Sequence, residues 1–204
     1  MIDAGIPKDY VIKYWNLRAL QQGKLTVGFA GTPIAEQDKR YKIRSEFIMS
    51  HVDTDLATLD YGCGVGRYSK FFDKDRYLGV DITKQLLDIA IEENPEYSYR
   101  LLTSPTLGTV LPDIEQFFTA TVLQHNTDET VRCIFDSLSR YTLKTIAIYE
   151  STMNMHNLAN SHMHFRSIDE YYRLVNEYFN IKERVNYTHI IHGSEHSLMI
   201  YNLY

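Results

Sequence analysis

A chain of 204 residues, 44% hydrophobic and 23% charged, can bury the core of one globular domain and leaves little length for a second. Its net charge is -5 and its 21 lysines and arginines are scattered, which argues against a nucleic-acid partner. No apolar stretch approaches the roughly 20 residues that span a bilayer, and the N-terminus lacks the layout of a signal peptide. The two cysteines show no metal-ligand spacing, so we expect a cytoplasmic protein without membrane contact.

The first part of the chain, residues 1–52, is predicted to form a helical cap. A first helix is expected to end at Gly23, and a second is expected over 35–51 after a glycine-bearing loop. The first helix carries side chains at helical spacing, namely Val11, Tyr14, Trp15 and Arg18.

From residue 55 the pattern changes to alternating strands and helices, which predicts an α/β core over 55–204. The predicted strands are 56–61, 76–81, 97–102, 116–123 and 144–150. Helices are expected at 65–72, at 84–93 with Thr83 as cap, after a capping box of Asn126 and Glu129, and after a second box of Ser167 and Glu170.

The end of the chain has the pattern of an antiparallel hairpin. Two β-rich runs, 181–191 and 196–204, are joined by the short turn "HGSE". Five strands that alternate with helices predict a parallel, doubly wound sheet, because parallel neighbours need crossover connections. The hairpin then adds a reversed strand at one edge. We therefore predict a single domain with a Rossmann-like, seven-stranded α/β sheet, mostly parallel, with an antiparallel C-terminal hairpin and N-terminal helices.

A glycine turn follows the first predicted strand, in the stretch "LDYGCGVGRY" at 59–68. In open α/β sheets ligands bind beyond the carboxyl ends of the strands. A tight turn explains one or two glycines, whereas three in alternation, with acids at Asp60 and Asp81, indicate a bound nucleoside. A dinucleotide site would need glycine where Arg67 stands, which disfavours a nicotinamide-dependent oxidoreductase. The upstream acid would repel a pyrophosphate but attract a cation, such as the ammonium of S-adenosylmethionine.

Three stretches, "LDYGCGVGRYSKFF", "RYLGVDIT" and "IEQFFTATVLQHNTDE", resemble the first, second and fourth-strand motifs of class I S-adenosylmethionine-dependent methyltransferases that act on small molecules. The resemblance covers residues 55–204. It implies that Gly62, Gly64 and Gly66 let the backbone approach the methionine part of this cofactor. It also implies that Asp60 lies near the cofactor's ammonium group.

The same resemblance implies the ribose and adenine contacts. Asp81 would accept hydrogen bonds from both ribose hydroxyls, which suits a carboxylate with two acceptor oxygens. Ile82 and Leu123 would lie beside the cofactor. Many members hold the adenine amine with an acid after the third strand, but this chain has "LLTSPTLG" there. Thr103, Ser104 or a backbone carbonyl would then take that role.

Two side chains are candidates for the general base that an oxygen nucleophile needs. His125 follows the fourth predicted strand and titrates near neutrality. Its alternative role is to fix the loop through bonds to the backbone. Glu150, at the end of the fifth predicted strand, is the second candidate, and it could equally cap local backbone.

Acceptor-binding side chains are expected from two segments that flank the predicted site. His162 and His164 lie in the loop after the fifth strand, and Tyr14 and Arg18 lie on the first helix. A His-x-His pair is also a possible metal site. Because no acid lies within this loop and methyl transfer needs no metal, we predict no metal. The alternative for the first helix is simple packing onto the sheet, which we expect of Trp15.

The sequence therefore predicts a methyltransferase that uses S-adenosyl-L-methionine to methylate an oxygen or nitrogen of a small molecule, such as a sugar or sugar conjugate. An RNA or protein methyltransferase is one alternative. A non-catalytic module that binds S-adenosylmethionine is another. We expect a monomer or a homodimer.

Overall fold

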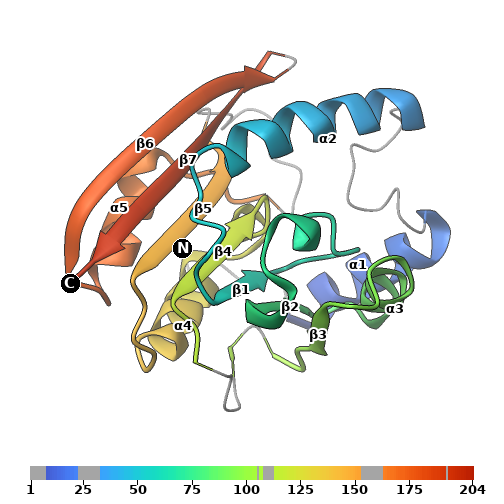
Figure 1. The fold of residues 1–204 in the computed structure, drawn as a ribbon, viewed down its shortest axis with the longest axis horizontal. Helices are drawn as coiled ribbons and strands as arrows, with labels where there is room; N and C mark the ends of the chain where they lie inside the picture. Colours follow the sequence, from blue (N-terminus) through green and yellow to red (C-terminus); the bar gives the residue numbers. More distant parts are fainter. Residues whose placement is uncertain (1–7, 23–32, 105, 108–112, 153–162, 192) are drawn as a thin grey trace, which may run out of the picture.

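The computed structural model describes the chain except for residues 1–7, 23–32, 105, 108–112, 153–162 and 192 (Figure 1). The helices are α1 (Lys8–Gln22), α2 (Ile34–Met49), α3 (Lys84–Glu93), α4 (Asp128–Leu138) and α5 (Ile168–Asn176). The strands are β1 (Thr58–Tyr61), β2 (Tyr77–Asp81), β3 (Ser98–Leu101), β4 (Gln116–Ala120), β5 (Thr145–Ser151), β6 (Ile181–Ile191) and β7 (Ser194–Leu203). Short 3-10 helices are η2 (Ser69–Phe71), η3 (Lys74–Arg76) and η4 (Leu123–His125).

The strands form one seven-stranded sheet in the order β3-β2-β1-β4-β5-β7-β6. The first five strands are mutually parallel, and β7 is antiparallel to both β5 and β6. This confirms the predicted fold class. The reversed strand is not at the edge, however. The largely buried β7 pairs with β5, and the half-exposed β6 is left as the edge strand.

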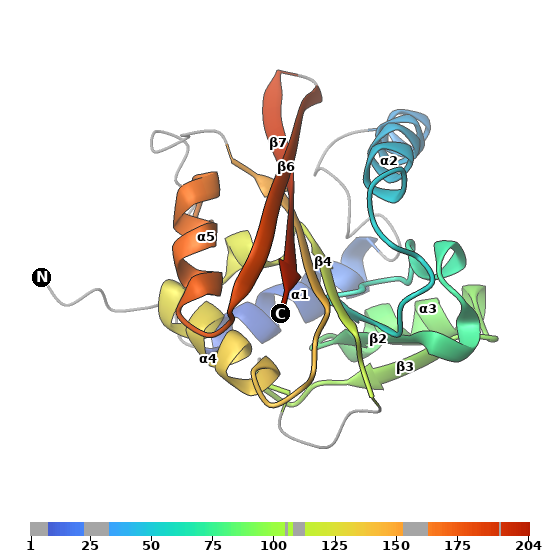
Figure 2. The same ribbon diagram turned by 60° about the vertical axis from the view of Figure 1, so that its left-hand side comes forward.

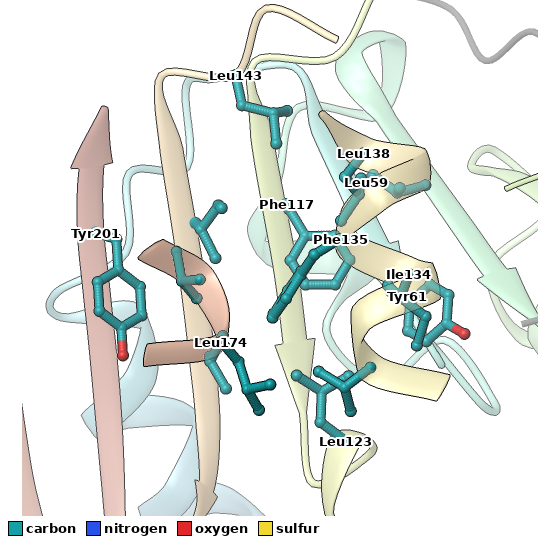
Figure 3. Packing of buried hydrophobic residues seen from close by; sticks show 14 of the residues in the cluster. Leu59, Tyr61, Phe117, Leu123, Ile134, Phe135, Leu138, Leu143, Leu174 and Tyr201 are labelled. Atoms are coloured by element: carbon teal, nitrogen blue, oxygen red, sulfur yellow. The ribbon is translucent and has the colours of Figure 1, made fainter. Parts of the chain in front are cut away.

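The central strands are buried on both faces, because helices or turns cover each side of the sheet (Figure 2). On one face, α4 and α5 pack against Phe117 and its neighbours (Figure 3). On the other, α2 packs over Phe118 and Tyr149. Burying one such side chain contributes about 1.5–3 kcal/mol. The consecutive phenylalanines of β4 therefore join both layers, one on each face.

Our prediction of a helix over residues 65–72 was wrong. The segment forms turns and the short η2 instead. The glycines before and within it have positive φ angles, 75° at Gly62, 56° at Gly64 and 70° at Gly66. A right-handed helix needs negative φ throughout its length. The crossover from β1 to β2 is therefore made without an α-helix.

The capping box predicted at Asn126 and Glu129 was wrong by one residue. The N-cap of α4 is Thr127, whose hydroxyl accepts the N–H of Thr130. Asn126 is used elsewhere, because its side-chain amide donates to the carbonyl of Val122 at 2.9 Å and so closes η4. The Asn126 side chain could cap α4 or close η4, and in the structure it closes η4.

Of the other two predicted caps, the one at Ser167 is confirmed in full and the one at Thr83 only in its position. The box of Ser167 and Glu170 is present, with each side chain accepting the other residue's backbone N–H. Thr83 occupies the N-cap position of α3, but its side chain makes no capping bond. Its N–H instead donates to the carboxylate of Asp81. None of the helices in the described segments is long and apolar enough to cross a membrane.

Candidate active site

The carboxyl ends of β1, β2, β4 and β5 meet at one edge of the sheet, and the strand order reverses between β1 and β4 (Figure 1). This is the topological switch point at which open α/β sheets bind ligands. The glycine turn that follows β1, residues 62–66, lies at this edge. The sequence-predicted residues of β1, β2, β4 and β5 come together here because parallel strands end on the same side.

Crowding as well as backbone conformation requires glycine in this turn. A Cβ atom at Gly62 would lie 2.5 Å from a side-chain methyl of Val122, and one at Gly66 would lie 2.5 Å from the hydroxyl of Tyr99. Both glycines also have positive φ. The turn is therefore packed tightly against the end of β4 on one side and β3 on the other.

Asp81 connects this turn to the end of β2. Its Oδ2 accepts the N–H of Gly64 at 2.9 Å, and its Oδ1 accepts the N–H of Thr83 at 2.8 Å. The residue is only 8% exposed, and burial raises the pKa of the carboxyl while the N–H groups of Thr83 and Gly64 oppose that shift. Each oxygen has further acceptor capacity. Asp81 can therefore order the turn and still accept hydrogen bonds from a ligand.

Asp60 lies almost fully buried beneath the turn, where its Oδ2 accepts the hydroxyl of Tyr77 at 2.7 Å. Burial raises the pKa of Asp60 to about 7, the bond from Tyr77 opposes this, and the charge of Asp81 adds to it. The carboxyl of Asp60 therefore loses its proton more readily as the pH rises past neutrality. A cation placed beside Asp60 would favour the ionised form.

The loop after β4, residues 122–126, is held from two sides. Oε1 of Glu150 accepts the N–H groups of Val122 at 2.9 Å and Leu123 at 2.7 Å. From the other side, the guanidinium of Arg166 donates to the carbonyls of Leu123 at 3.0 Å and Asn126 at 2.7 Å. The Leu123 side chain is fully buried in the core shared with α4 and α5 (Figure 3).

Glu150 has the contacts of a backbone cap. It is fully buried, and its Oε2 has no hydrogen-bond partner among the described residues. Burial raises its pKa to about 8, against the opposing effects of the N–H groups of Leu123 and Val122 and of the charge of Arg166. These contacts favour the capping interpretation over proton transfer to a substrate.

His125 meets the N-terminal helix at the end of η4. The ring of Trp15 packs edge-on against the ring of His125, with 5.1 Å between centroids. Arg18 lies 5.5 Å over the Trp15 ring and donates to the hydroxyl of Tyr14 at 3.1 Å. The structure thus brings Tyr14 and Arg18 into one cluster with His125. Trp15, expected in the core, is the half-buried link between them.

The remaining candidates lie at the margins of the site. His164 is half-buried, and its N–H donates to the carbonyl of Gln124 at 2.6 Å, which joins the loop after β5 to the loop after β4. Thr103 is exposed beyond β3, and Ile82 is half-buried beside Asp81. His162 lies outside the described residues. Within the described part of the chain no cluster of three or more His, Cys, Asp or Glu could hold a metal.

Arg166 is a site residue that sequence reasoning missed. It is 4% exposed and pairs with Asp128 at 2.7 Å in addition to its carbonyl contacts. Nothing in its spacing distinguishes it from the other arginines. Asp128 and Asn126 lie 38 and 40 residues away from it along the chain, so only the folded structure reveals these contacts.

The strand order, the reversed β7 and the glycine turn together define the fold of class I S-adenosylmethionine-dependent methyltransferases. The structure is similar to magnesium protoporphyrin IX methyltransferase from Synechocystis PCC 6803 with bound S-adenosylhomocysteine, over 97% of this chain and 100% of that chain, at 12% identity and a TM-score of 0.72. It also resembles phosphoethanolamine N-methyltransferase 1 from Haemonchus contortus, over 96% of this chain and 49% of that chain, at 15% identity and a TM-score of 0.70.

A third similar structure is geranyl diphosphate C-methyltransferase from Streptomyces coelicolor A3(2), over 96% of this chain and 98% of that chain, at 13% identity and a TM-score of 0.68. No protein-family model matches the sequence, and no curated protein matches it. Similarity at these identities establishes the fold, which agrees with the family resemblance of the three sequence motifs.

Proposed function

We propose that this protein is an S-adenosylmethionine-dependent methyltransferase that methylates an oxygen or nitrogen of a small metabolite, such as a sugar or sugar conjugate. The observation that carries the proposal is the link between Asp81 and the N–H of Gly64 at the switch point of the sheet. It places a buried carboxylate and a positive-φ glycine turn side by side, with Asp60 beneath them. Similar folds have been solved with S-adenosylmethionine or S-adenosylhomocysteine bound.

In this proposal the residues at the glycine turn bind and orient the cofactor. Asp81 accepts hydrogen bonds from the ribose hydroxyls, and Asp60 supplies negative charge for the methionine ammonium. Ile82 covers the adenosine, and Thr103 lies where the adenine amine would need an acceptor. The bound cofactor supplies a methyl group already activated by its sulfonium. The chain therefore has chiefly to align a nucleophile with that methyl group, and positioning provides much of the rate.

The acceptor side would be formed by α1 and the loops after β4 and β5. His125 is the proposed general base, since Glu150 is occupied with the N–H groups of Val122 and Leu123. Tyr14 and Arg18 reach this loop through Trp15, and they are proposed to contact the acceptor together with His164. Holding the loop between Glu150 and Arg166 keeps His125 in one position.

A thermal-shift comparison tests the cofactor assignment. S-adenosylhomocysteine, S-adenosylmethionine, NAD and NADP are each added to the purified protein at equal concentration. Because a ligand that binds only the folded state raises its stability, the first two should raise the Tm and the last two should not. A rise with NAD alone would contradict the proposal. Labelled methyl donor and a panel of metabolites would then identify the acceptor.

A further inference from the structure

A cluster of basic and aromatic side chains joins α2, the carboxyl-terminal half of β5 and the β6–β7 hairpin. We call it the Arg44 cluster, and its members are Arg44, Tyr68, Tyr149, His189 and His196. The hydroxyl of Tyr149 and Nε2 of His189 are 2.8 Å apart. The guanidinium of Arg44 lies 5.7 Å over the Tyr149 ring, and the His196 ring is parallel to that ring at 5.5 Å between centroids. The cluster therefore draws on four parts of the fold, namely α2, the segment after the glycine turn, β5 and the β6–β7 hairpin.

The cluster carries the positive charge of Arg44. The carboxyls of Asp60 and Glu150 act on its members Tyr68 and Tyr149, but neither is ion-paired with Arg44. Arg44 makes no ion pair with any residue in the part of the chain that the structure describes. Its charge acts on its neighbours: the pKa of His196 is lowered to about 4, chiefly by burial and then by Arg44 and His189. The pKa of His189 is also lowered, by burial and then by Arg44. An anion at this position would relieve that excess charge.

Two polar atoms of the cluster are buried without a hydrogen-bond partner among the described residues. They are Nε of Arg44, which can only donate, and Nδ1 of His196. His196 is 4% exposed, so water does not freely solvate its ring. Buried polar atoms are nearly always paired in folded proteins, and leaving them unpaired costs free energy. Nε belongs to the guanidinium of Arg44, whose charge also acts on His196. The two atoms therefore indicate a place for a ligand that accepts hydrogen bonds.

The cluster adjoins the proposed cofactor site. Tyr68 follows the glycine turn directly after Arg67, and its ring is 5.7 Å from that of Tyr41 on α2. The hydroxyl of Tyr41 donates to the carbonyl of Arg67. One turn further along the same helix is Arg44. The bond between Tyr41 and Arg67 thus places α2, and with it the Arg44 cluster, beside the glycine turn of the proposed cofactor site.

We propose that the Arg44 cluster binds an oxyanion of the methyl acceptor, either a carboxylate or a phosphate monoester. This inference rests on the proposed methyltransferase function. An oxyanion offers charge to the guanidinium and lone pairs to Nε of Arg44 and to a Nδ1–H tautomer of His196. A cationic acceptor would be repelled by Arg44, and a neutral hydroxyl would leave the charge uncompensated.

Calorimetry with inorganic phosphate and with acetate tests the inference, in the presence and absence of S-adenosylhomocysteine. The wild type should bind at least one of the two anions saturably. Arg44→Met should weaken that binding at least tenfold, while S-adenosylhomocysteine binding stays within twofold. The matched control is Arg40→Met, one turn earlier on α2, where the side chain is paired with Glu36 at 3.1 Å. It should leave anion binding within twofold.

NMR of the histidine rings keeps the test decisive if Arg44→Met does not fold. In the wild type, the His196 ring signals should shift with added anion and saturate at the calorimetric Kd. Binding of phosphate alone would indicate a phosphorylated acceptor, and binding of acetate alone a carboxylic acid. If S-adenosylhomocysteine binds but neither anion does, the inference is overturned and the proposed function stands. If the cofactor analogue itself does not bind, the proposed function fails.

Discussion

Residues 60–83 supply the core of the proposed cofactor edge, whereas the proposed acceptor side draws on α1, α2, β5, the loops after β4 and β5, and the β6–β7 hairpin. On the cofactor edge, a carboxylate bonds directly to backbone N–H groups, as in the contacts of Asp81 with Gly64 and Thr83. On the acceptor side, side chains from distant segments meet one another, as do Trp15 and His125. The carboxylate contacts of Asp81 on the cofactor edge thus join residues at most 17 positions apart, whereas the acceptor side joins segments that are far apart in the sequence. We therefore expect substitutions in the two regions to affect different measurements.

The largest expected effect is on turnover, and we expect it without a change in cofactor affinity. If His125 is the general base, His125→Ala should lower turnover by about 10²–10⁴-fold, as is typical of a positioned proton acceptor. Affinity for S-adenosylhomocysteine should stay nearly unchanged, because the cofactor edge lies elsewhere. Steady-state kinetics with the identified acceptor and calorimetry on the same samples provide the two readouts. A turnover loss found only in Glu150→Gln would transfer the role to Glu150, and full turnover in both variants would show that the acceptor needs no protein base.

The fold itself was largely predictable because its signals are local and periodic. The strand positions, the apolar face of α4 and the hairpin follow from spacing that any window of the sequence displays. The helix over 65–72 was predicted wrongly because its apolar spacing matched a helix while glycine φ angles imposed turns. The spacing of apolar residues indicates which side chains are buried. The backbone conformation of the glycine turn determines whether the segment forms a helix or turns.

The sequence predicted which residues meet at the proposed cofactor edge, but not the contacts that hold the loop after β4. Asp60, Asp81 and the glycines lie in motifs with fixed spacing, so their meeting follows from adjacent parallel strands. The bonds that hold the loop after β4 join Glu150 and Arg166 to residues 27 to 43 positions away. Such pairs leave no periodic signal in one sequence. The Arg44 cluster was missed for the same reason.

The second effect concerns the pH dependence of stability. Burial raises the pKa of Glu150 to about 8 in the folded chain, from its ordinary value of 4.5. The folded state therefore holds this proton more tightly, so its contribution is complete below about pH 4.5 and is lost as pH rises through 8. The slope is up to about 1.4 kcal/mol per pH unit in that range.

Glu150→Gln should remove this slope, because the amide is neutral at every pH and keeps a carbonyl oxygen for Val122 and Leu123. Urea unfolding of both proteins at pH 6, 7 and 8 gives the comparison. The wild type should lose stability relative to the variant as pH rises. A constant difference across this range would mean that Glu150 does not change its protonation there.

The smallest expected effect is a pH dependence of cofactor affinity that arises from the carboxyl of Asp60. With a pKa of about 7, Asp60 is ionised to about a tenth at pH 6 and to about half at pH 7. Because a bound ammonium favours the carboxylate, affinity for S-adenosylhomocysteine should increase about fivefold over that interval. Asp60→Asn should flatten the dependence, because the amide carries no charge at any pH. Equal pH profiles for the two proteins would show that Asp60 does not contact the ammonium.

Calorimetric titration of S-adenosylhomocysteine into the wild type, Asp81→Asn and Asp88→Asn tests the central claim most directly. Asp88 is the matched control, since it is exposed on α3 and paired with Lys84 at 2.7 Å. Charge-assisted hydrogen bonds are worth about 1.5–3 kcal/mol each, so Asp81→Asn should weaken binding at least tenfold while Asp88→Asn stays at the wild-type value. A folded Asp81→Asn protein that binds as tightly as the wild type, or a wild type that does not bind at all, would contradict the assignment of this edge as the cofactor site.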